Sequence, residues 1–317
     1  MRTMAETVLG VLILIFLLSS GTASEDDEDV PWNEYHLQTL LQGVDYWNGW
    51  RDENPEEFPE LSSVNLTEAR LSLVNLQEGD MAVAKLTRSE LIGANLLKAD
   101  LTGADLVGAN LTGANLEKAD LEEANLTDAN LNETDLKWAD LEKADLNGTR
   151  LNRADLKGTD LAGAYLGGAD LTGAYLIGAD LTGAYLERAD LTGAVMIGAD
   201  LRGADLKMAD MTGAYLERAE LAGADLIGAD LTGADLKMAD MTGARMENSD
   251  LAGADLVGAD LRMADLNGAR MERADLTGAN LIGADLTGAN LRMAVLTGTY
   301  LTDAPLVERE TWRIIGM

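Results

Sequence analysis

Residues 169–193 read ADLTGAYLIGADLTGAYLERADLTG, in which one five-residue unit returns without interruption. The unit is a small residue, usually Ala, then Asp or Asn, then Leu, then two variable residues that are often Thr-Gly. Counted outward from this stretch, every fifth residue from Leu61 to Leu306 is Leu or Met. These 50 positions hold 44 Leu and six Met, and no insertion or deletion breaks their register. Internal repetition therefore decides the architecture of most of the chain.

A period of five residues fits neither regular secondary structure. On a helix the Leu side chains would spread around the axis, and on a flat strand successive Leu would point to opposite sides. The pattern instead predicts a coil that turns a corner every five residues. Leu and the small residue two positions earlier point inward, and the Asp between them points outward. The next two residues form the corner, where Gly costs least.

The repeated unit, as at 169–173, 179–183 and 189–193, resembles the signature of the pentapeptide-repeat family, and the resemblance covers residues 61–306. It implies an all-β fold, a right-handed quadrilateral parallel β-helix with four pentapeptides in each coil. About twelve coils, each adding roughly 4.8 Å, would give a rod about 60 Å long. Residues 20 positions apart would then stack along one side of the rod.

Residues 1–24 have the pattern of a signal peptide. Arg2 precedes an apolar run from Val8 to Leu18, and small residues follow as far as Ser24, which predicts cleavage near Ala23 or Ser24. An uncleaved anchor is the alternative, although the run is short for the ~20 residues of a spanning helix. We expect export to the periplasm, thylakoid lumen or cell exterior, with no stable membrane insertion after cleavage.

Residues 25–60 are predicted to form an acidic leader and a capping helix. Apolar residues recur at helical spacing after Pro31, which suits a helix start. Trp47 and Trp50 are expected to cover the first coil, because an open β-helix end exposes apolar surface and unpaired edges. The stretch Gly43–Arg51 resembles the leader of bacterial, especially cyanobacterial, members of the family, and so indicates an exported member of that type.

Residues 307–317 are predicted to form a C-terminal cap, in which Trp312 leaves the five-residue period and covers the last coil. This tail is too short for a substantial dimerisation helix. We therefore expect a monomer or a weak end-to-end dimer. His36, in the predicted capping helix, is interpreted as a surface or packing residue.

Composition removes most enzyme and nucleic-acid classes. The chain has 24 Lys and Arg against 55 Asp and Glu, a formal net charge of −31, so we expect no nucleic-acid partner. It has no Cys and one His, which excludes thiol catalysis, Cys-based zinc sites and catalytic triads. We predict no enzyme activity, no catalytic residue, no cofactor and no defined metal site.

Apolar side chains break the acidic pattern at several outward positions, and five of these form two lines. Tyr165 and Tyr185 are 20 residues apart and should stack, while Tyr175, Val195 and Tyr215 form a second line on the opposite face. One reading is an amphipathic interaction strip for an unknown protein partner. The other is stacking on a β-surface without any partner.

Three functions remain open. The first is a non-enzymatic exported rod with a structural or protein-interaction role. The second, implied by the family resemblance, is a DNA mimic that binds DNA gyrase; the signal peptide, the uninterrupted coils and the short C-terminal tail oppose it. The third is a weak divalent-cation-binding rod, because outward Asp residues about 4.8 Å apart repel one another by about 0.9 kcal/mol in water.

Overall fold

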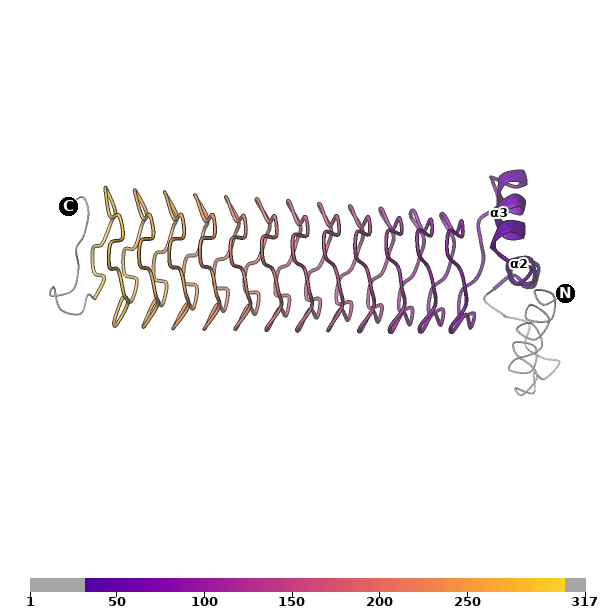
Figure 1. Ribbon diagram of the computed structural model, residues 1–317, viewed down its shortest axis with the longest axis horizontal. Coiled ribbons are helices and arrows are strands. Elements are labelled where there is room, and N and C mark those ends of the chain that lie inside the picture. The colour runs from indigo at the N-terminus through magenta and orange to yellow at the C-terminus, as the bar shows by residue number, and fades with distance from the viewer. Residues whose placement is uncertain (1–31, 306–317) are drawn as a thin grey trace.

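The computed structural model describes residues 32–305, which form a long rod with two short helices at its N-terminal end (Figure 1). The helices are α2, Glu34–Leu40, and α3, Val44–Glu53. Beyond them, isolated parallel β-bridges join residues 20 positions apart, and twelve such steps lead from Glu60 to Tyr300. The predicted quadrilateral β-helix with a short helical cap is confirmed. The predicted signal peptide, the C-terminal cap and Trp312 lie outside the described residues.

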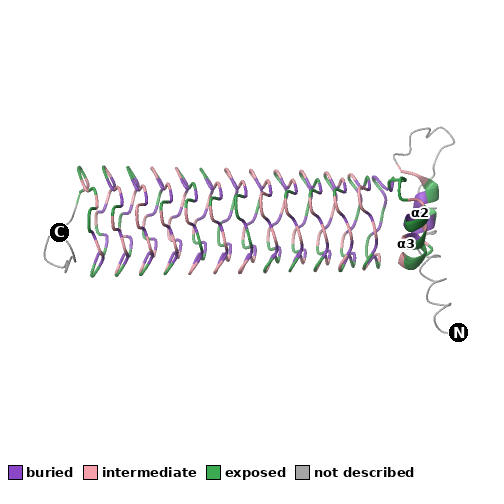
Figure 2. Ribbon diagram, turned by 90° about the horizontal axis from the view of Figure 1, so that it is seen from above, coloured by how far each residue is buried: buried purple, intermediate pink, exposed green. Residues whose placement is uncertain are grey.

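The five-residue positions form the core of the rod. From Leu61 to Leu296 every Leu or Met at these positions is buried, and the small residue two positions earlier is buried beside it at nearly every repeat (Figure 2). Each buried Leu contributes about 1.5–3 kcal/mol, but ordering each residue of the chain costs about 1–2 kcal/mol. A single coil therefore cannot stand alone, and each coil depends on its neighbours.

The outward Asp or Asn completes the hydrogen bonding of each repeat. Four of the five backbone N–H groups donate to carbonyl oxygens, either in an adjacent coil or across the turn. The fifth N–H, on the residue after Leu, donates to Oδ1 of the outward side chain; Thr182 donates in this way to Asp180 over 2.8 Å. Asp180 is accordingly half-buried, and its outward direction alone did not reveal this link to the backbone.

The corners have the conformation that the sequence predicts. The second residue after each Leu lies in the left-handed region, as at Gly178 with φ 63° and Trp138 with φ 58°. Gly enters this region without steric cost, whereas another residue pays roughly 1–2 kcal/mol. This is why Gly is frequent there and why a bulky residue such as Trp138 is conspicuous.

The cap differs from prediction in one respect. A single helix starting at Pro31 was expected, but α2 starts after Asn33, whose side chain accepts the N–H groups of Tyr35 and His36. Gly43, with φ 114°, then separates α2 from α3. The chain turns here because only Gly adopts this backbone conformation readily. Within residues 32–305 no helix is long and apolar enough to cross a membrane.

Candidate interaction surface

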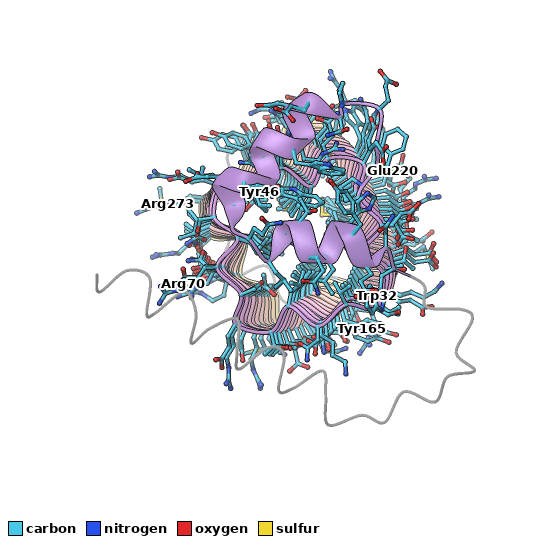
Figure 3. All side chains as sticks on the ribbon, turned by 90° about the vertical axis from the view of Figure 1, so that its right-hand side faces the viewer. Trp32, Tyr46, Arg70, Tyr165, Glu220 and Arg273 are labelled. Atoms are coloured by element: carbon cyan, nitrogen blue, oxygen red, sulfur yellow. The ribbon has the colours of Figure 1, made fainter. Side chains whose placement is uncertain are left out.

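The outward side chains form four columns, one on each side of the rod, because residues 20 positions apart are bridged. Seen along the axis, Tyr165, Arg70 and Glu220 point to three different sides (Figure 3). One column is acidic over eleven consecutive coils. We call it the acidic column, and its members are Glu60, Asp80, Asp100, Asp120, Asp140, Asp160, Asp180, Asp200, Glu220, Asp240 and Asp260.

The five predicted interaction residues separate into two groups. Tyr165 and Tyr185 stack as predicted, with ring centroids 5.0 Å apart and planes 5° from parallel. Tyr175, Val195 and Tyr215 are bridged in succession in a different column, ten residues or half a coil away. The two groups therefore lie on opposite faces at the same height of the rod, and a single flat partner would contact one group only.

The second group belongs to a larger apolar surface that the sequence reasoning missed. Ile177 and Ile197 lie two residues after Tyr175 and Val195, at the adjoining corner, and Ile177 is exposed. Trp138, 62% exposed, lies on the same edge of the rod and covers the corner at Gly158, one coil before the corner that contains Ile177. A Cβ placed on Gly158 would lie 2.1 Å from the Trp138 ring, so the indole covers that glycine. The apolar patch, as we name it, comprises Trp138, Tyr175, Ile177, Val195, Ile197 and Tyr215.

These additional residues had a signal in the sequence. Their corner positions usually hold Thr, Gly or a charged residue, so Ile and Trp depart from the repeat there as much as Tyr departs from Asp at the outward position. The prediction considered only the outward position. The corners matter because they join one face of the rod to the next.

A low edge separates the apolar patch from the acidic column. Each corner there has two residues, and the second is glycine, at Gly158, Gly178 and Gly198, with the Trp138 indole lying over Gly158. At Gly178 and Gly198 an added Cβ would meet no atom within 4 Å. The surface at these two glycines consists of backbone alone, so another chain can approach it closely.

Lysines flank the apolar patch but are already paired. The Nζ of Lys157 lies 5.1 Å from the Tyr175 ring centroid and 3.1 Å from a carboxylate oxygen of Asp155. At the other end Lys237 lies 3.0 Å from Asp235 and 2.8 Å from Asp255. Hydrogen bonds from the ammonium to these two carboxylates raise the pKa of Lys237.

The acidic column is neutralised only in its C-terminal half. Arg202 pairs with Asp200 and lies 3.3 Å from Glu220, and Arg262 lies 2.7 Å from Asp260. From Asp80 to Asp180, no described Lys or Arg forms an ion pair with the column. Burial, and then the charges of the Asp140 and Asp180 carboxylates, raise the pKa of Asp160.

Among the residues that the structure describes, no group of three or more His, Asp or Glu side chains is arranged to hold a metal ion. The aspartates of the acidic column are spaced one coil apart along the rod. They therefore form a line of single carboxylates and not a cluster around a common point.

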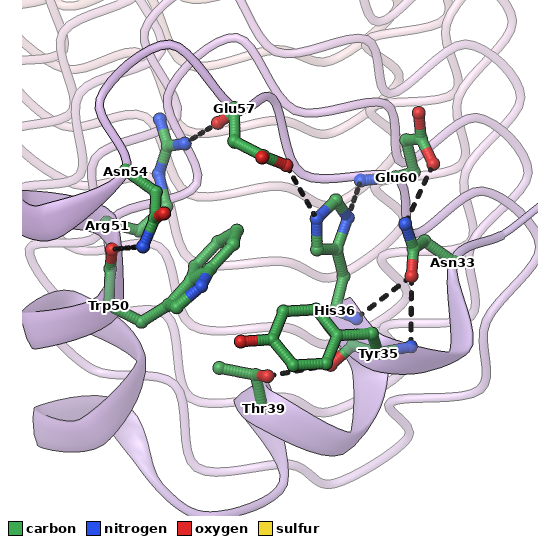
Figure 4. A network of polar contacts seen from close by, with 9 residues as sticks. All are labelled: Asn33, Tyr35, His36, Thr39, Trp50, Arg51, Asn54, Glu57 and Glu60. Carbon is green, nitrogen blue, oxygen red and sulfur yellow. Dashed lines mark hydrogen bonds and ion pairs between the residues drawn. The ribbon is translucent and has the colours of Figure 1, made fainter.

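The N-terminal cap is held to the first coils by named contacts. Trp47 is fully buried, and its Nε1 donates to the carbonyl of Asn75 over 2.7 Å. The ring of Trp50 lies 5.0 Å from the rings of both Trp47 and His36. His36 is buried, and its Nδ1 accepts the backbone N–H of Glu60 over 3.1 Å (Figure 4). The packing role expected of His36 agrees with these contacts.

The family profile for pentapeptide repeats matches the chain in eight copies. The copies cover residues 69–108, 80–117, 104–142, 134–173, 169–207, 209–248, 239–278 and 279–307. The chain belongs to the pentapeptide-repeat family. The resemblance inferred from the five-residue unit is thereby confirmed.

Several solved pentapeptide-repeat proteins resemble this one. HetL, involved in heterocyst differentiation regulation in the cyanobacterium Nostoc sp. strain PCC 7120, is 38% identical, with 64% of this chain and 86% of HetL covered and a TM-score of 0.45. A protein of the Arabidopsis thaliana thylakoid lumen is 33% identical over 34% of this chain and 71% of its own, with a TM-score of 0.30. QnrB1, a plasmid-mediated fluoroquinolone resistance protein, is 22% identical over 55% and 86%, with a TM-score of 0.30. The search of curated proteins found no match.

Proposed function

We propose that this pentapeptide-repeat protein is a non-enzymatic exported rod that binds a partner protein through its apolar patch. The observation that carries the proposal is the run of Tyr175, Val195 and Tyr215 in a column that elsewhere holds mostly Asp and Asn. Tyr175 is 42% and Tyr215 50% exposed. Contiguous exposed aromatic side chains are typical of protein interfaces, where Tyr and Trp contribute much of the binding energy.

Export is supported by the sequence of residues 1–24 and by the acidic run Glu25–Asp29 that follows it. Fractionation of cells that carry a C-terminally tagged chain would locate the protein. Sequencing the N-terminus of the purified protein should give a start at Ser24 or Glu25. A chain that begins at Met1 and resists carbonate extraction from membranes would instead establish the anchor.

Partner binding can be tested in the cell by photo-crosslinking. A benzophenone amino acid at Tyr175 should give a crosslinked product of defined mass. The same group at Asn110, on a different side of the rod, should give none. Addition of Val195→Asp, which restores a common outward residue of the repeat, should abolish the Tyr175 product. Equal crosslinking from Tyr175 and Asn110 would argue against the patch as the interface.

DNA mimicry is the second candidate, and the acidic column is the observation that favours it. Residues 61–306 carry 20 Lys and Arg against 40 Asp and Glu, a net charge of −20 along about 60 Å, or one charge per about 3 Å against roughly 1.7 Å for duplex DNA. If this function holds, the protein should fractionate with the cytoplasm and inhibit DNA supercoiling by gyrase. An exported protein without effect on gyrase would leave the interaction rod as the function.

A further inference from the structure

We propose that the apolar patch and the neighbouring acidic column together form a docking surface for an amphipathic basic helix that lies along the rod. This inference rests on the proposed function of the chain as a protein-binding rod, and it defines the chemistry of the partner.

The spacing of the apolar patch fits a helix. Tyr175, Val195 and Tyr215 are one coil apart, about 4.8 Å per step, whereas one helical turn advances 5.4 Å. From the Trp138 indole over Gly158 to Tyr215 the patch spans three steps, about 14 Å, which matches roughly ten residues of helix. A strand presents same-side residues every ~6.6–6.8 Å and falls out of step within two coils.

The low edge of the docking surface gives the helix a place to lie. The second residue of the corner is Gly178 in one coil and Gly198 in the next, so a helix can approach the backbone at these two positions. On one side of this edge it would meet Ile177 and Ile197. On the other side it would meet Asp180 and the rest of the acidic column, two residues beyond the glycines. A complementary helix has Leu-like residues on one flank and Lys or Arg on the next.

Charge selects a basic partner over a second copy of the chain. Asp160 and Asp180 border the patch without any described Lys or Arg paired to them, while Lys157 is occupied by Asp155 and the Tyr175 ring. Basic side chains of a partner would supply the missing counter-charges. Two copies, each with a net charge of −31, would repel each other. A patch about 14 Å long also offers much less than the roughly 800 Å² per partner of a standard stable interface.

The probe for this proposal is a fluorescent synthetic helix of about 14 residues, with Leu at positions i, i+3, i+4 and i+7 and Arg on the adjacent flank. Two control peptides have the same composition in scrambled order, or Glu in place of Arg. Binding to the full mature chain is followed by fluorescence anisotropy at 0.15 M salt. Sedimentation of the protein without peptide reports whether it forms a dimer, in which a second copy would occupy the docking surface.

Three protein variants separate the contributions of the apolar patch and of the acidic column to peptide binding. Tyr175→Asp with Val195→Asp and Tyr215→Asp introduces a residue that the repeat already uses outward, and it makes the protein more acidic. This triple variant should weaken binding at least tenfold despite its added negative charge. Its matched control, Tyr165→Asp with Tyr185→Asp on the opposite face, should bind like the parent chain. Asp160→Asn with Asp180→Asn keeps both backbone hydrogen bonds and should weaken binding about two- to fivefold, less so in high salt.

Several outcomes would refute the proposal that a basic helix docks on the apolar patch and the acidic column. They are equal binding of the designed and scrambled peptides, undiminished binding to the triple Asp variant, a stable dimer in sedimentation, and preferential binding to anionic lipid vesicles. If the designed peptide fails to bind while Tyr175 still crosslinks to a protein in the cell, the basic-helix partner is excluded and the interaction rod survives. Loss of both signals removes the proposed function as well.

Discussion

Substitution of Asp180 separates two opposing roles of the outward aspartates. Its Oδ1 accepts the N–H of Thr182 over 2.8 Å, and such a hydrogen bond contributes about 1 kcal/mol. Its carboxylate also lies one coil from Asp160 and from Asp200, but the charge of Asp200 is offset by its ion pair with Arg202. The unpaired charge of Asp160, at about 4.8 Å, costs about 0.9 kcal/mol in pure water and roughly 0.5 kcal/mol near 0.15 M salt. The hydrogen bond and the repulsion therefore oppose each other with the same order of magnitude.

The two simplest substitutions remove different combinations of these terms. Asp180→Asn keeps the acceptor and removes the charge, so the free energy of unfolding should rise by about 0.5 kcal/mol at 0.15 M salt. Asp180→Ala removes both, so the free energy of unfolding should fall slightly, by about 0.5 kcal/mol. In 1 M NaCl the Debye length falls to about 3 Å. The Asn variant should then equal the parent chain, and the Ala variant should be about 1 kcal/mol less stable.

The measurement is urea unfolding of the purified protein, followed by circular dichroism at both salt concentrations. Asn115→Ala is the matched control, because Asn115 accepts the N–H of Glu117 over 3.0 Å without carrying a charge. It should lose about 1 kcal/mol at either salt concentration. Equal stabilities of Asp180→Asn and Asp180→Ala would refute the hydrogen-bond term. A gap between them that changes strongly with salt would refute the separation of the two terms.

Three further predictions follow from the same geometry. Leu181→Asp places an unpaired charge in the fully buried core and should cost several kcal/mol, seen as a large drop in Tm; a drop no larger than that of Asp180→Ala would contradict the inward assignment. Because burial and neighbouring carboxylates raise the pKa of Asp160, its ionised form destabilises the fold at neutral pH, and this penalty disappears as pH falls below the ordinary aspartate range. Asp160→Asn should therefore raise Tm at pH 7 and leave it unchanged at low pH. Dilute hydrogen peroxide should oxidise the exposed methionines before the buried ones, as measured by peptide mass spectrometry. The exposed set is Met208, Met238, Met263 and Met293, and the buried set is Met81, Met196, Met211, Met241, Met246 and Met271.

The rod could be predicted in detail because every repeat has to meet the same requirement, which is the burial of its Leu. Every Leu from Leu61 onward must reach the same interior, and only a coil with a corner every five residues allows this. The break at Gly43 could not be predicted in the same way. A glycine inside an apolar helical pattern is compatible with a continuous helix, and its φ of 114° is set by how the cap meets the first coil.

The candidate site was predicted in part. The stacking of Tyr165 on Tyr185 follows directly from the 20-residue coil, and so does the separate line through Tyr175. The contribution of Trp138 does not, because it depends on the side chain leaning over Gly158 in the next coil. The hydrogen bond from the outward Asp to the corner backbone was also missed, since alternation along a strand says where a side chain points but not what it accepts.

The 20-residue register makes the angular position of any surface feature a matter of counting. Removal of 20 residues between the cap and Tyr175, for example 106–125, would bring the two closer by one coil and leave their relative orientation unchanged. Removal of only ten, 106–115, would preserve the five-residue unit equally well, yet it would turn everything downstream by half a revolution. The chain contains such a half-integral step: residues 206–214 recur at 236–244, which sends Met208 and Met238 to opposite edges. In this architecture, an insertion or deletion of whole repeats rotates the downstream part of the rod relative to the cap. A protein that gains or loses an odd number of repeat pairs, ten residues each, would have the opposite side of the rod aligned with the cap.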